Sequence, residues 1–336
     1  MKTPSFQDDG SVNVPAFTLP PSQFMSAEAA GFLKMRAGRP PASTIFDAGT
    51  VAELRAANDA MLEPLLKALE QEYPVSLELA TVGGIKADII TPVGHGTDPA
   101  RVLINLHGGG FMMGENICGL IESIPIAVLG GYRIVSVHYR QAPEHHFPDS
   151  SVDVANVYKA LLEDYDPGCI GIFGGSAGGV LTGQATAWIQ REGLPRPGAI
   201  AMLGAGAERG HVGDSHYYAA YADGSFHPPR DGKPVPMPFS TYFDGEDPSD
   251  PMISPAFHPN ILAQFPPALL ITGTRAHDLS SAAFTHTALR KAGAEAELFV
   301  ADGLGHCYMM NPFQPESRDA YKFIVDFFKR HLGSVE

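Results

Sequence analysis

The sequence contains little cysteine, a deficit of basic residues and no long hydrophobic run. Its 336 residues include three cysteines, Cys118, Cys169 and Cys307, which are widely spaced and form no CxxC pair. We therefore expect neither a disulfide framework nor a structural zinc site. No stretch of about 18 uncharged apolar residues occurs, so we expect no membrane span.

Charge and the first residues exclude further classes of protein. Lys and Arg number 23 against 37 Asp and Glu, which gives a net charge of −14. Such an anionic surface repels a phosphate backbone, so nucleic-acid binding is not expected. Residues 1–17 lack the continuous apolar stretch of a secretory signal. Together with the few cysteines, this predicts a cytoplasmic protein.

Short apolar runs alternate with helical segments over most of the chain after residue 100. Strands buried on both faces of a sheet read as apolar runs, and their alternation with helices indicates parallel pairing. The pattern predicts an α/β fold with a mostly parallel central sheet and helices on both faces. The expected strands are 101–106, 133–137, 169–173, 199–203, 268–272 and 296–300, and the expected helices are 152–163, 180–192, 281–292 and 319–332.

Three other segments follow different patterns. An apolar stripe over residues 50–74 predicts a helix that is kinked at Pro64. The alternating stretch 75–92, with Gly83-Gly84 in its middle, predicts a hairpin. Residues 205–259 are rich in Gly, Pro, His and Tyr and show little regular pattern. An irregular segment of this length in a compact domain is typical of a lid or binding loop.

Residues 174–178 read Gly-Gly-Ser-Ala-Gly, directly after an expected strand and before an expected helix. This is the G-x-S-x-G pattern in its usual context. Small neighbours let a serine occupy a strained turn, with its hydroxyl exposed at the end of the sheet and a helix N-terminus beside it. The pattern makes Ser176 a candidate nucleophile. A glycine-rich turn without chemistry is the alternative.

A second glycine cluster, residues 107–111 (His-Gly-Gly-Gly-Phe), follows the first expected strand. Acyl transfer needs N–H donors that are fixed in advance around the developing oxyanion. Consecutive glycines let backbone amides approach a substrate closely. We expect the N–H groups of Gly108, Gly109 and Ala177 to form this oxyanion hole. A phosphate-binding turn is the alternative, although the Walker lysine is missing.

Four separated motifs occur in the order found in a known family: HGGGF (107–111), HYRQAPEHHFP (138–148), GGSAGG (174–179) and GLGHCY (303–308). Over roughly residues 75–335 the sequence resembles the hormone-sensitive-lipase branch of the α/β-hydrolase superfamily, the bacterial HGGG esterases. The resemblance implies an α/β-hydrolase core at 75–336, cap helices at 1–74 and a lid or cap contribution from 205–259. Dimers are common in the family, so a homodimer is one option.

A serine nucleophile requires a base, most often histidine. Among thirteen histidines, His306 stands out because it follows the last expected strand, where the resemblance also places the base. The superfamily acid lies between nucleophile and base in the chain, and Asp278 is the carboxylate that follows strand 268–272. The family's usual spacing points instead to position 276, which is Ala276 here. Asp302 is therefore kept as an alternative acid.

A second departure from the family concerns Gly175, where this branch commonly carries Asp before the serine. That residue is not one of the three catalytic groups, so we expect the reaction to survive with different hydrogen-bonding support for the loop. We also expect His107 to support the glycine loop rather than transfer protons. Apolar residues in the glycine loop and the irregular segment are expected to line a substrate pocket: Phe111, Met112, Met113, Tyr217 and Phe226.

These features predict a serine carboxylic-ester hydrolase for small to medium, apolar acyl esters, with no cofactor and no metal. Ser176 is the expected nucleophile, His306 the base, and Asp278 the group that orients the base. Two alternatives stay open. The same residues could cleave an amide, lactone or carbamate, or the chain could be a non-catalytic small-molecule receptor on the same scaffold, an interpretation that rests on Ala276.

Overall fold

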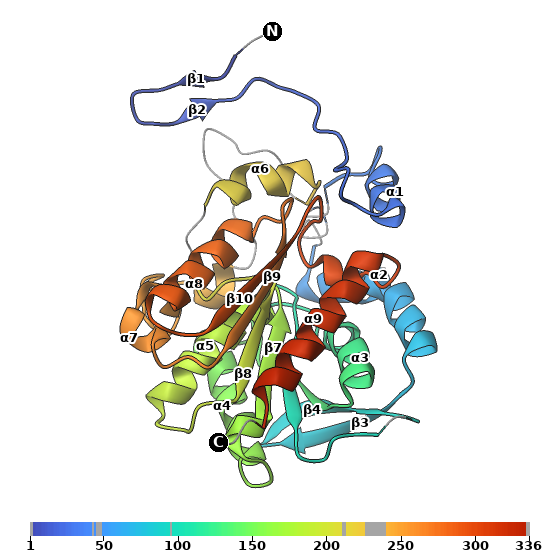
Figure 1. The fold of residues 1–336 in the computed structure, drawn as a ribbon, viewed down its shortest axis with the longest axis vertical. Coiled ribbons are helices and arrows are strands. Elements are labelled where there is room, and N and C mark those ends of the chain that lie inside the picture. The colour runs from blue at the N-terminus through green and yellow to red at the C-terminus, as the bar shows by residue number, and fades with distance from the viewer. Residues whose placement is uncertain are drawn as a thin grey trace.

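The computed structural model describes residues 3–41, 44, 49–94, 96–209, 213–225 and 240–333. An eight-stranded sheet forms its centre, in the order β10-β9-β8-β7-β5-β6-β4-β3 (Figure 1). Its strands are β3 (Val75–Val82), β4 (Ile85–Pro92), β5 (Val102–Leu106), β6 (Arg133–Val137), β7 (Ile170–Gly175), β8 (Ala199–Leu203), β9 (Ala268–Gly273) and β10 (Ala296–Ala301). All six strands predicted after residue 100 are present, within a few residues of their expected ends.

Pairing within the sheet is parallel from β6 through β5, β7, β8 and β9 to β10. Only β4 pairs antiparallel on both sides, with β3 and with β6, among the strands of this sheet. The predicted hairpin is the β3–β4 pair. Gly83 and Gly84 have φ angles of 57° and 82°, as a two-residue type I′ turn requires. The prediction of a mostly parallel sheet is confirmed.

Helices cover both faces of the sheet (Figure 1). On one face pack α4 (Asp149–Leu161), α5 (Ala177–Arg191) and α8 (Leu279–Lys291), with the short α7 (Pro259–Leu262) against α8. On the other face pack α3 (Cys118–Gly130) and α9 (Pro315–His331), with α2 (Val51–Glu72) against α3. Each face buries its own cluster of hydrophobic side chains.

The remaining elements lie around the carboxyl end of the sheet or extend from it. A small hairpin of β1 (Ser5–Phe6) and β2 (Val12–Asn13) projects away from the body of the molecule, and α1 (Ala27–Met35) contacts α9 (Figure 1). The irregular segment 205–259 contains α6 (Asp214–Ala222) and two 3₁₀ turns, Ser240–Phe243 and Pro255–Phe257. Helix α2 runs continuously through Pro64.

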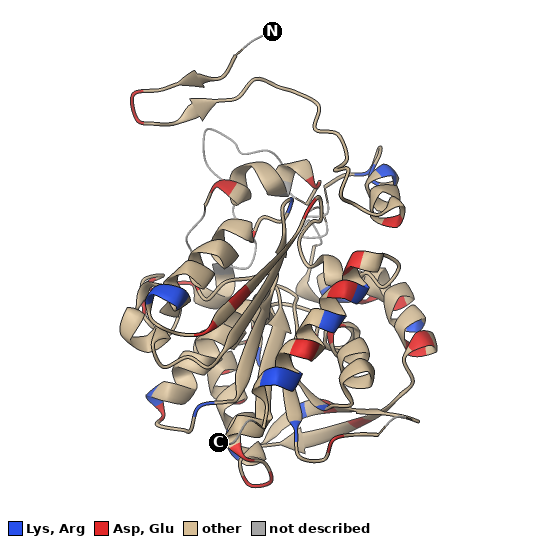
Figure 2. Cartoon of the chain, in the orientation of Figure 1, with Lys and Arg blue, Asp and Glu red and all other residues tan. Residues whose placement is uncertain are grey.

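Charged side chains lie on the covering elements rather than in the centre of the sheet. Figure 2 shows both signs of charge on helices such as α9, whereas β5, β7, β8 and β9 carry no charged residue. The central strands therefore bury apolar surface on both faces, as parallel sheets do. Within the described ranges, no helix combines the length and hydrophobicity that crossing a bilayer requires.

Candidate active site

Ser176 lies on the turn between β7 and α5, at the carboxyl end of the sheet. Its φ of 53° is positive, which is uncommon for a residue with a side chain. The glycines around it allow a close approach of backbone. A Cβ at Gly174 would lie 2.2 Å, and one at Gly178 1.7 Å, from the carbonyl oxygen of Leu106 at the end of β5. Only glycine therefore fits at positions 174 and 178, two residues before and two residues after the strained serine.

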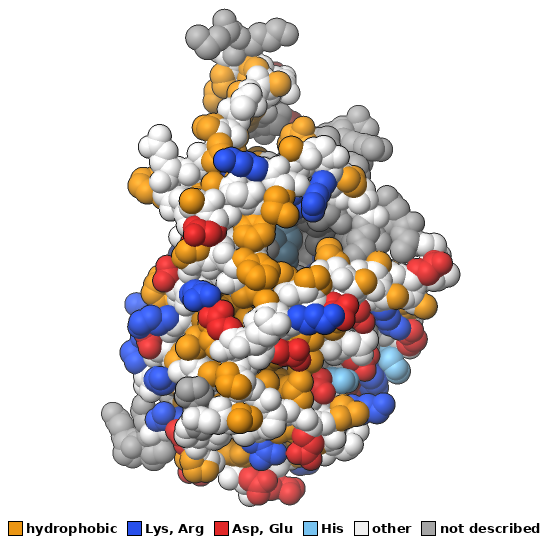
Figure 3. Space-filling model, turned by 90° about the vertical axis from the view of Figure 1, so that its right-hand side faces the viewer, with side chains coloured by type: hydrophobic (Ala, Val, Ile, Leu, Met, Phe, Trp, Pro, Cys, Tyr) orange, Lys and Arg blue, Asp and Glu red, His pale blue; other side chains and the backbone are white. Residues whose placement is uncertain are grey.

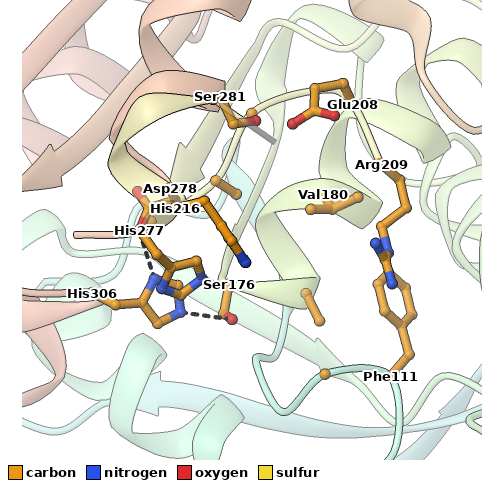
Figure 4. A pocket seen from close by; sticks show the side chains of 16 residues that line it. Phe111, Ser176, Val180, Glu208, Arg209, His216, His277, Asp278, Ser281 and His306 are labelled. Carbon is orange, nitrogen blue, oxygen red and sulfur yellow. Dashed lines mark hydrogen bonds and ion pairs between the residues drawn. The ribbon is translucent and has the colours of Figure 1, made fainter. Parts of the chain in front are cut away.

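Two side chains from later in the chain meet Ser176 at this edge. Nε2 of His306, in the loop after β10, lies 2.9 Å from Oγ of Ser176. Nδ1 of the same ring lies 2.6 Å from Oδ1 of Asp278 (Figure 4). The hydroxyl of Thr272 donates a 2.6 Å hydrogen bond to the other oxygen of Asp278. Hydroxyl, imidazole and carboxylate thus form a continuous hydrogen-bonded chain, the arrangement that activates a serine.

Burial and mutual contact set the charges of this chain. Asp278 is 6% exposed, and burial is the largest single influence and opposes its negative charge, but the hydrogen bonds from His306 and Thr272 and the positive charge of His306 act together to lower the pKa of Asp278. Burial likewise opposes a positive His306, whereas its contacts with Cys307 and Asp278 raise the pKa of His306 well above its ordinary value. Asp278 therefore stays ionised and can stabilise an imidazolium at His306.

The two other candidate positions for the acid lie differently. Ala276, at the family's usual spacing, contributes a fully buried methyl group. Asp302 accepts hydrogen bonds from the hydroxyls of Ser22 and Thr274. Asp278 immediately precedes α8, on the turn that leaves β9. From there its carboxylate reaches the His306 ring although it stands two residues beyond the family's position.

The glycine loop after β5 differs from the prediction in one donor. The N–H of Gly108 donates a 2.9 Å hydrogen bond to Oε1 of Glu122, so Gly108 is wrong as an oxyanion donor. Gly110 lines the same cavity as the nucleophile and Ala177. In the part of the chain that the structure describes, no residue accepts a hydrogen bond from the N–H of Gly109 or Gly110. The N–H of Ala177, at the first position of α5, has no partner within the helix. These three N–H groups are available to an oxyanion.

Comparison with known proteins decides the family. A family model described as the alpha/beta hydrolase fold matches residues 103–310. The chain belongs to the α/β-hydrolase family. The match covers β5 to the His306 loop, and so includes every group of the hydrogen-bonded chain.

Relatives of this α/β hydrolase include an acetyl-hydrolase and an acetate esterase. An acetyl-hydrolase of Streptomyces hygroscopicus is 27% identical over 258 residues, which are 76% of this chain and 83% of that protein. A versiconal hemiacetal acetate esterase of Dothistroma septosporum is 27% identical over 288 residues, 80% of this chain and 85% of that protein.

Solved structures that are similar to this chain include esterases as well. Esterase E25 superposes with a TM-score of 0.80 at 28% identity, covering 96% of this chain and 99% of that one. An esterase of the bacterial hormone-sensitive lipase family gives a TM-score of 0.77 at 28% identity, with coverage of 92% and 99%. The comparisons confirm the predicted fold, the resemblance to the hormone-sensitive-lipase branch and the prediction of an esterase.

Glu122 also belongs to the site of this α/β hydrolase, and the sequence analysis did not identify it. It lies on α3, is 6% exposed, and accepts hydrogen bonds from the N–H of Gly108 (2.9 Å), the N–H of Gly175 (3.2 Å) and Nδ2 of Asn105 (2.9 Å). Burial raises the pKa of Glu122 to about 7. One carboxylate therefore joins β5, the glycine loop and the residue before the nucleophile. A signal was present, because Glu122 is the single charged residue of the α3 sequence.

The same carboxylate accounts for Gly175, the second departure from the family. A Cβ at Gly175 would lie 2.6 Å from Oε1 of Glu122, so a side chain fits there in this hydrolase only if the Glu122 carboxylate moves away from the N–H groups that it accepts. Where the branch commonly has an aspartate beside the nucleophile, a carboxylate here reaches the same loop from α3. The loop keeps a buried acceptor, supplied by another element.

A cavity of about 130 Å³ opens beside the nucleophile of the hydrolase. Of the residues predicted to line the substrate pocket, Phe111 lies in its wall. Met112 and Met113 are buried in the hydrophobic core instead. Tyr217 of α6 is 36% exposed and is not part of this wall. Phe226 lies outside the described residues.

Two histidines near the site, one buried and one half-buried, stay neutral. Burial lowers the pKa of His107 to about 4, and its ring stacks on Tyr139 at a centroid distance of 4.3 Å. This agrees with a supporting role for His107 in the glycine loop. Burial also lowers the pKa of His277 to about 3, and its ring centroid lies 4.2 Å from that of His306. The base is therefore packed against an uncharged ring.

A second cavity, of about 230 Å³, also reaches His306. Its wall includes Phe32 of α1, Arg36 just after α1, and Asp223 after α6. Figure 3, which looks at the side of the molecule that carries α1, shows a hollow bordered by hydrophobic side chains with a histidine in its depth. The imidazole can thus be approached from two spaces, one that contains Ser176 and one that does not.

Proposed function

We propose that the protein is a serine carboxylic-ester hydrolase that works through an acyl-enzyme. The observation that carries this proposal is the hydrogen-bonded chain from Ser176 through His306 to Asp278, with its serine end in the wall of a cavity. The names of the relatives, acetyl-hydrolase and acetate esterase, support the same reaction.

In the proposed mechanism, Oγ of Ser176 attacks the ester carbonyl while Nε2 of His306 takes its proton. The N–H groups of Gly109, Gly110 and Ala177 hold the oxyanion, and loss of one such donor typically costs about 100- to 1000-fold in rate. The imidazolium, stabilised by its carboxylate partner, then gives its proton to the leaving alcohol. Water releases the acyl group by the same route, and no cofactor takes part.

The size of the cavity supports a short acyl group. Its volume of about 130 Å³ is small beside the roughly 300–1,000 Å³ of sites for drug-sized ligands. Apolar side chains in its wall include Phe111, Val180 and Ala205. Small to medium acyl esters are therefore the proposed substrates. An acetate esterase matches 80% of this chain, whereas an arylacetamide deacetylase matches 24% of it, so esters are preferred over amides. No observation favours lactones or carbamates. The receptor interpretation rested on Ala276 and loses that basis, because Asp278 contacts His306.

The decisive experiment replaces the nucleophile. Ser176→Ala should lower the turnover of p-nitrophenyl butyrate by at least about 10⁴-fold, since the remaining groups cannot form an acyl-enzyme. A fluorophosphonate probe should label the wild-type protein and not this variant. Ser281→Ala, which removes another serine of the cavity wall, should still be labelled. Unchanged turnover in Ser176→Ala would refute the mechanism.

A further inference from the structure

The wall of the Ser176 cavity contains a cation that the proposed reaction does not use. Arg209 lies there, and its backbone is fixed on both sides by Ser254: the N–H of Arg209 donates to Oγ at 2.9 Å, and the Ser254 hydroxyl donates to the Arg209 carbonyl at 3.1 Å. The guanidinium lies over the ring of Phe243, 5.4 Å from its centroid. Its backbone is thus held in place, and its head group faces an aromatic surface.

No carboxylate of the described residues lies within ion-pair distance of the Arg209 guanidinium. Other arginines of the chain do have such partners: Arg55 pairs with Glu144, and Arg140 with Asp153. Burial lowers the pKa of Arg209, and the negative charge of the nearby Glu208 raises it by less. An arginine stays charged in any case. A guanidinium that is partly removed from water and has no carboxylate partner among the described residues is unfavourable, and an anion in the cavity would reduce that cost.

The position of Arg209 indicates which end of an ester it would meet. His306 must reach the leaving oxygen to protonate it, so the alcohol part lies on the His306 side of the carbonyl. In Figure 4, Arg209 lies on the far side of Ser176 from His306 and extends toward Phe111. The second cavity, which includes His306 but neither Ser176 nor Arg209, gives the alcohol a separate space. Arg209 therefore faces the acyl part.

We propose that Arg209 binds a carboxylate at the end of the acyl chain, so that the preferred substrates are half-esters of short dicarboxylic acids. This inference rests on the proposed ester hydrolysis. A guanidinium matches a carboxylate with two parallel N–H···O bonds, which fixes the acyl chain in direction as well as in place. Because the net charge of −14 repels anions in general, selection of an anionic acyl group depends on this local cation.

The test compares two esters of equal chain length. Monoethyl glutarate carries the terminal carboxylate, and ethyl pentanoate has a methyl group in its place. The quantity measured is the ratio of their kcat/KM values. Arg209→Gln should lower this ratio by about 10- to 100-fold, the usual worth of a hydrogen bond to a charged group, and Arg209→Lys should restore part of it. Arg191→Gln is the matched control, since that guanidinium also lies over an aromatic ring, Trp188, and is not part of the cavity wall.

Each outcome decides the inference. A ratio that is the same in wild-type and Arg209→Gln proteins, with ethyl pentanoate hydrolysed by both, overturns it and leaves ester hydrolysis intact. Absence of turnover of either ester, and of p-nitrophenyl butyrate, refutes the proposed function itself. A fourth substrate, 4-acetoxybutyrate, carries its carboxylate on the alcohol part. If Arg209→Gln affects this ester more than monoethyl glutarate, the assignment to the acyl part is wrong.

Discussion

Two regions of different character meet at the nucleophile. At the carboxyl end of the sheet, His306 bonds to both Ser176 and Asp278. Ser176 directly follows β7, and Asp278 and His306 lie in the loops that follow β9 and β10. In the irregular segment that follows β8, Arg209 lines the same cavity but has no carboxylate partner among the described residues. The residues at the strand ends thus interact with one another, whereas the irregular segment offers a charged side chain to a ligand. The two proposals thus assign reaction and selection to separate parts of the chain.

After loss of the nucleophile, the largest effect within the strand-end region is expected when its acid, Asp278, is replaced. Asp278→Asn should lower kcat by about 10⁴-fold, because an amide cannot stabilise the imidazolium and favours the wrong tautomer of the ring. Steady-state turnover of p-nitrophenyl butyrate measures this. Since the proposal places Asp278 in the reaction and not in binding, KM should change little.

Asp302→Asn is the matched control for the acid. Asp302 also follows a strand, but its oxygens bond to the hydroxyls of Ser22 and Thr274 rather than to the base. This variant should keep nearly full activity. If Asp302→Asn lost as much activity as Asp278→Asn, the acid would have to be reassigned.

Most of the strand-end region could be predicted because its signals are local. A glycine run or a G-x-S-x-G turn is read from adjacent residues, and parallel strands bring their ends to one edge. The exception is Gly108, whose N–H turns toward Glu122, a partner 14 residues away on another element. Helix α3 itself was missed because it is buried almost all round, so it shows no polar face and no helical stripe.

The irregular region could not be predicted in the same way. Arg209 owes its place to Ser254 and Phe243, which lie far along the chain and share no sequence pattern with it. Met112 and Met113 follow Phe111 directly, yet only Phe111, with a positive φ of 61°, faces the cavity. Such positions depend on long-range packing and on single backbone angles, and neither of these produces a periodic pattern in the sequence.

Replacement of Glu122 tests whether the activity of the strand-end region depends on this carboxylate. Glu122→Gln should lower kcat by about 10- to 100-fold with little change in KM, because the amide NH₂ faces N–H donors and loosens the oxyanion loop. In the wild type, activity should fall with decreasing pH through about 7, as Glu122 gains a proton and loses an acceptor site. His306, whose pKa is raised, adds to this loss as it becomes protonated. Burial raises the pKa values of the neighbouring Cys118 and Tyr139, so both stay uncharged there.

Two further variants separate support of the loop from mere packing. Glu115→Gln changes a carboxylate that pairs with His138 near the same loop and should leave the pH profile unchanged. Gly175→Asp should be damaging alone, since its Cβ would lie 2.6 Å from the Glu122 carboxylate. In a Glu122→Ala background the same change should recover activity, because the new carboxylate then has both room and N–H donors. If Gly175→Asp were equally harmful in both backgrounds, an aspartate at position 175 could not take over the role of the Glu122 carboxylate.

The smallest expected effect concerns the attachment of the N-terminal part to the site. Arg55 of α2 donates to the carbonyls of Met112 and Ala142 and pairs with Glu144, on partly exposed side chains. Arg55→Ala should lower the free energy of unfolding by about 1 kcal/mol, since solvent weakens exposed ion pairs, and thermal denaturation measures this. Because the hydrogen-bonded chain at Ser176 has no contact with Arg55, kcat should stay within about twofold of the wild type, as for most surface changes. A tenfold loss of kcat at unchanged stability would mean that α2 positions the glycine loop, and that the strand-end region does not stand alone.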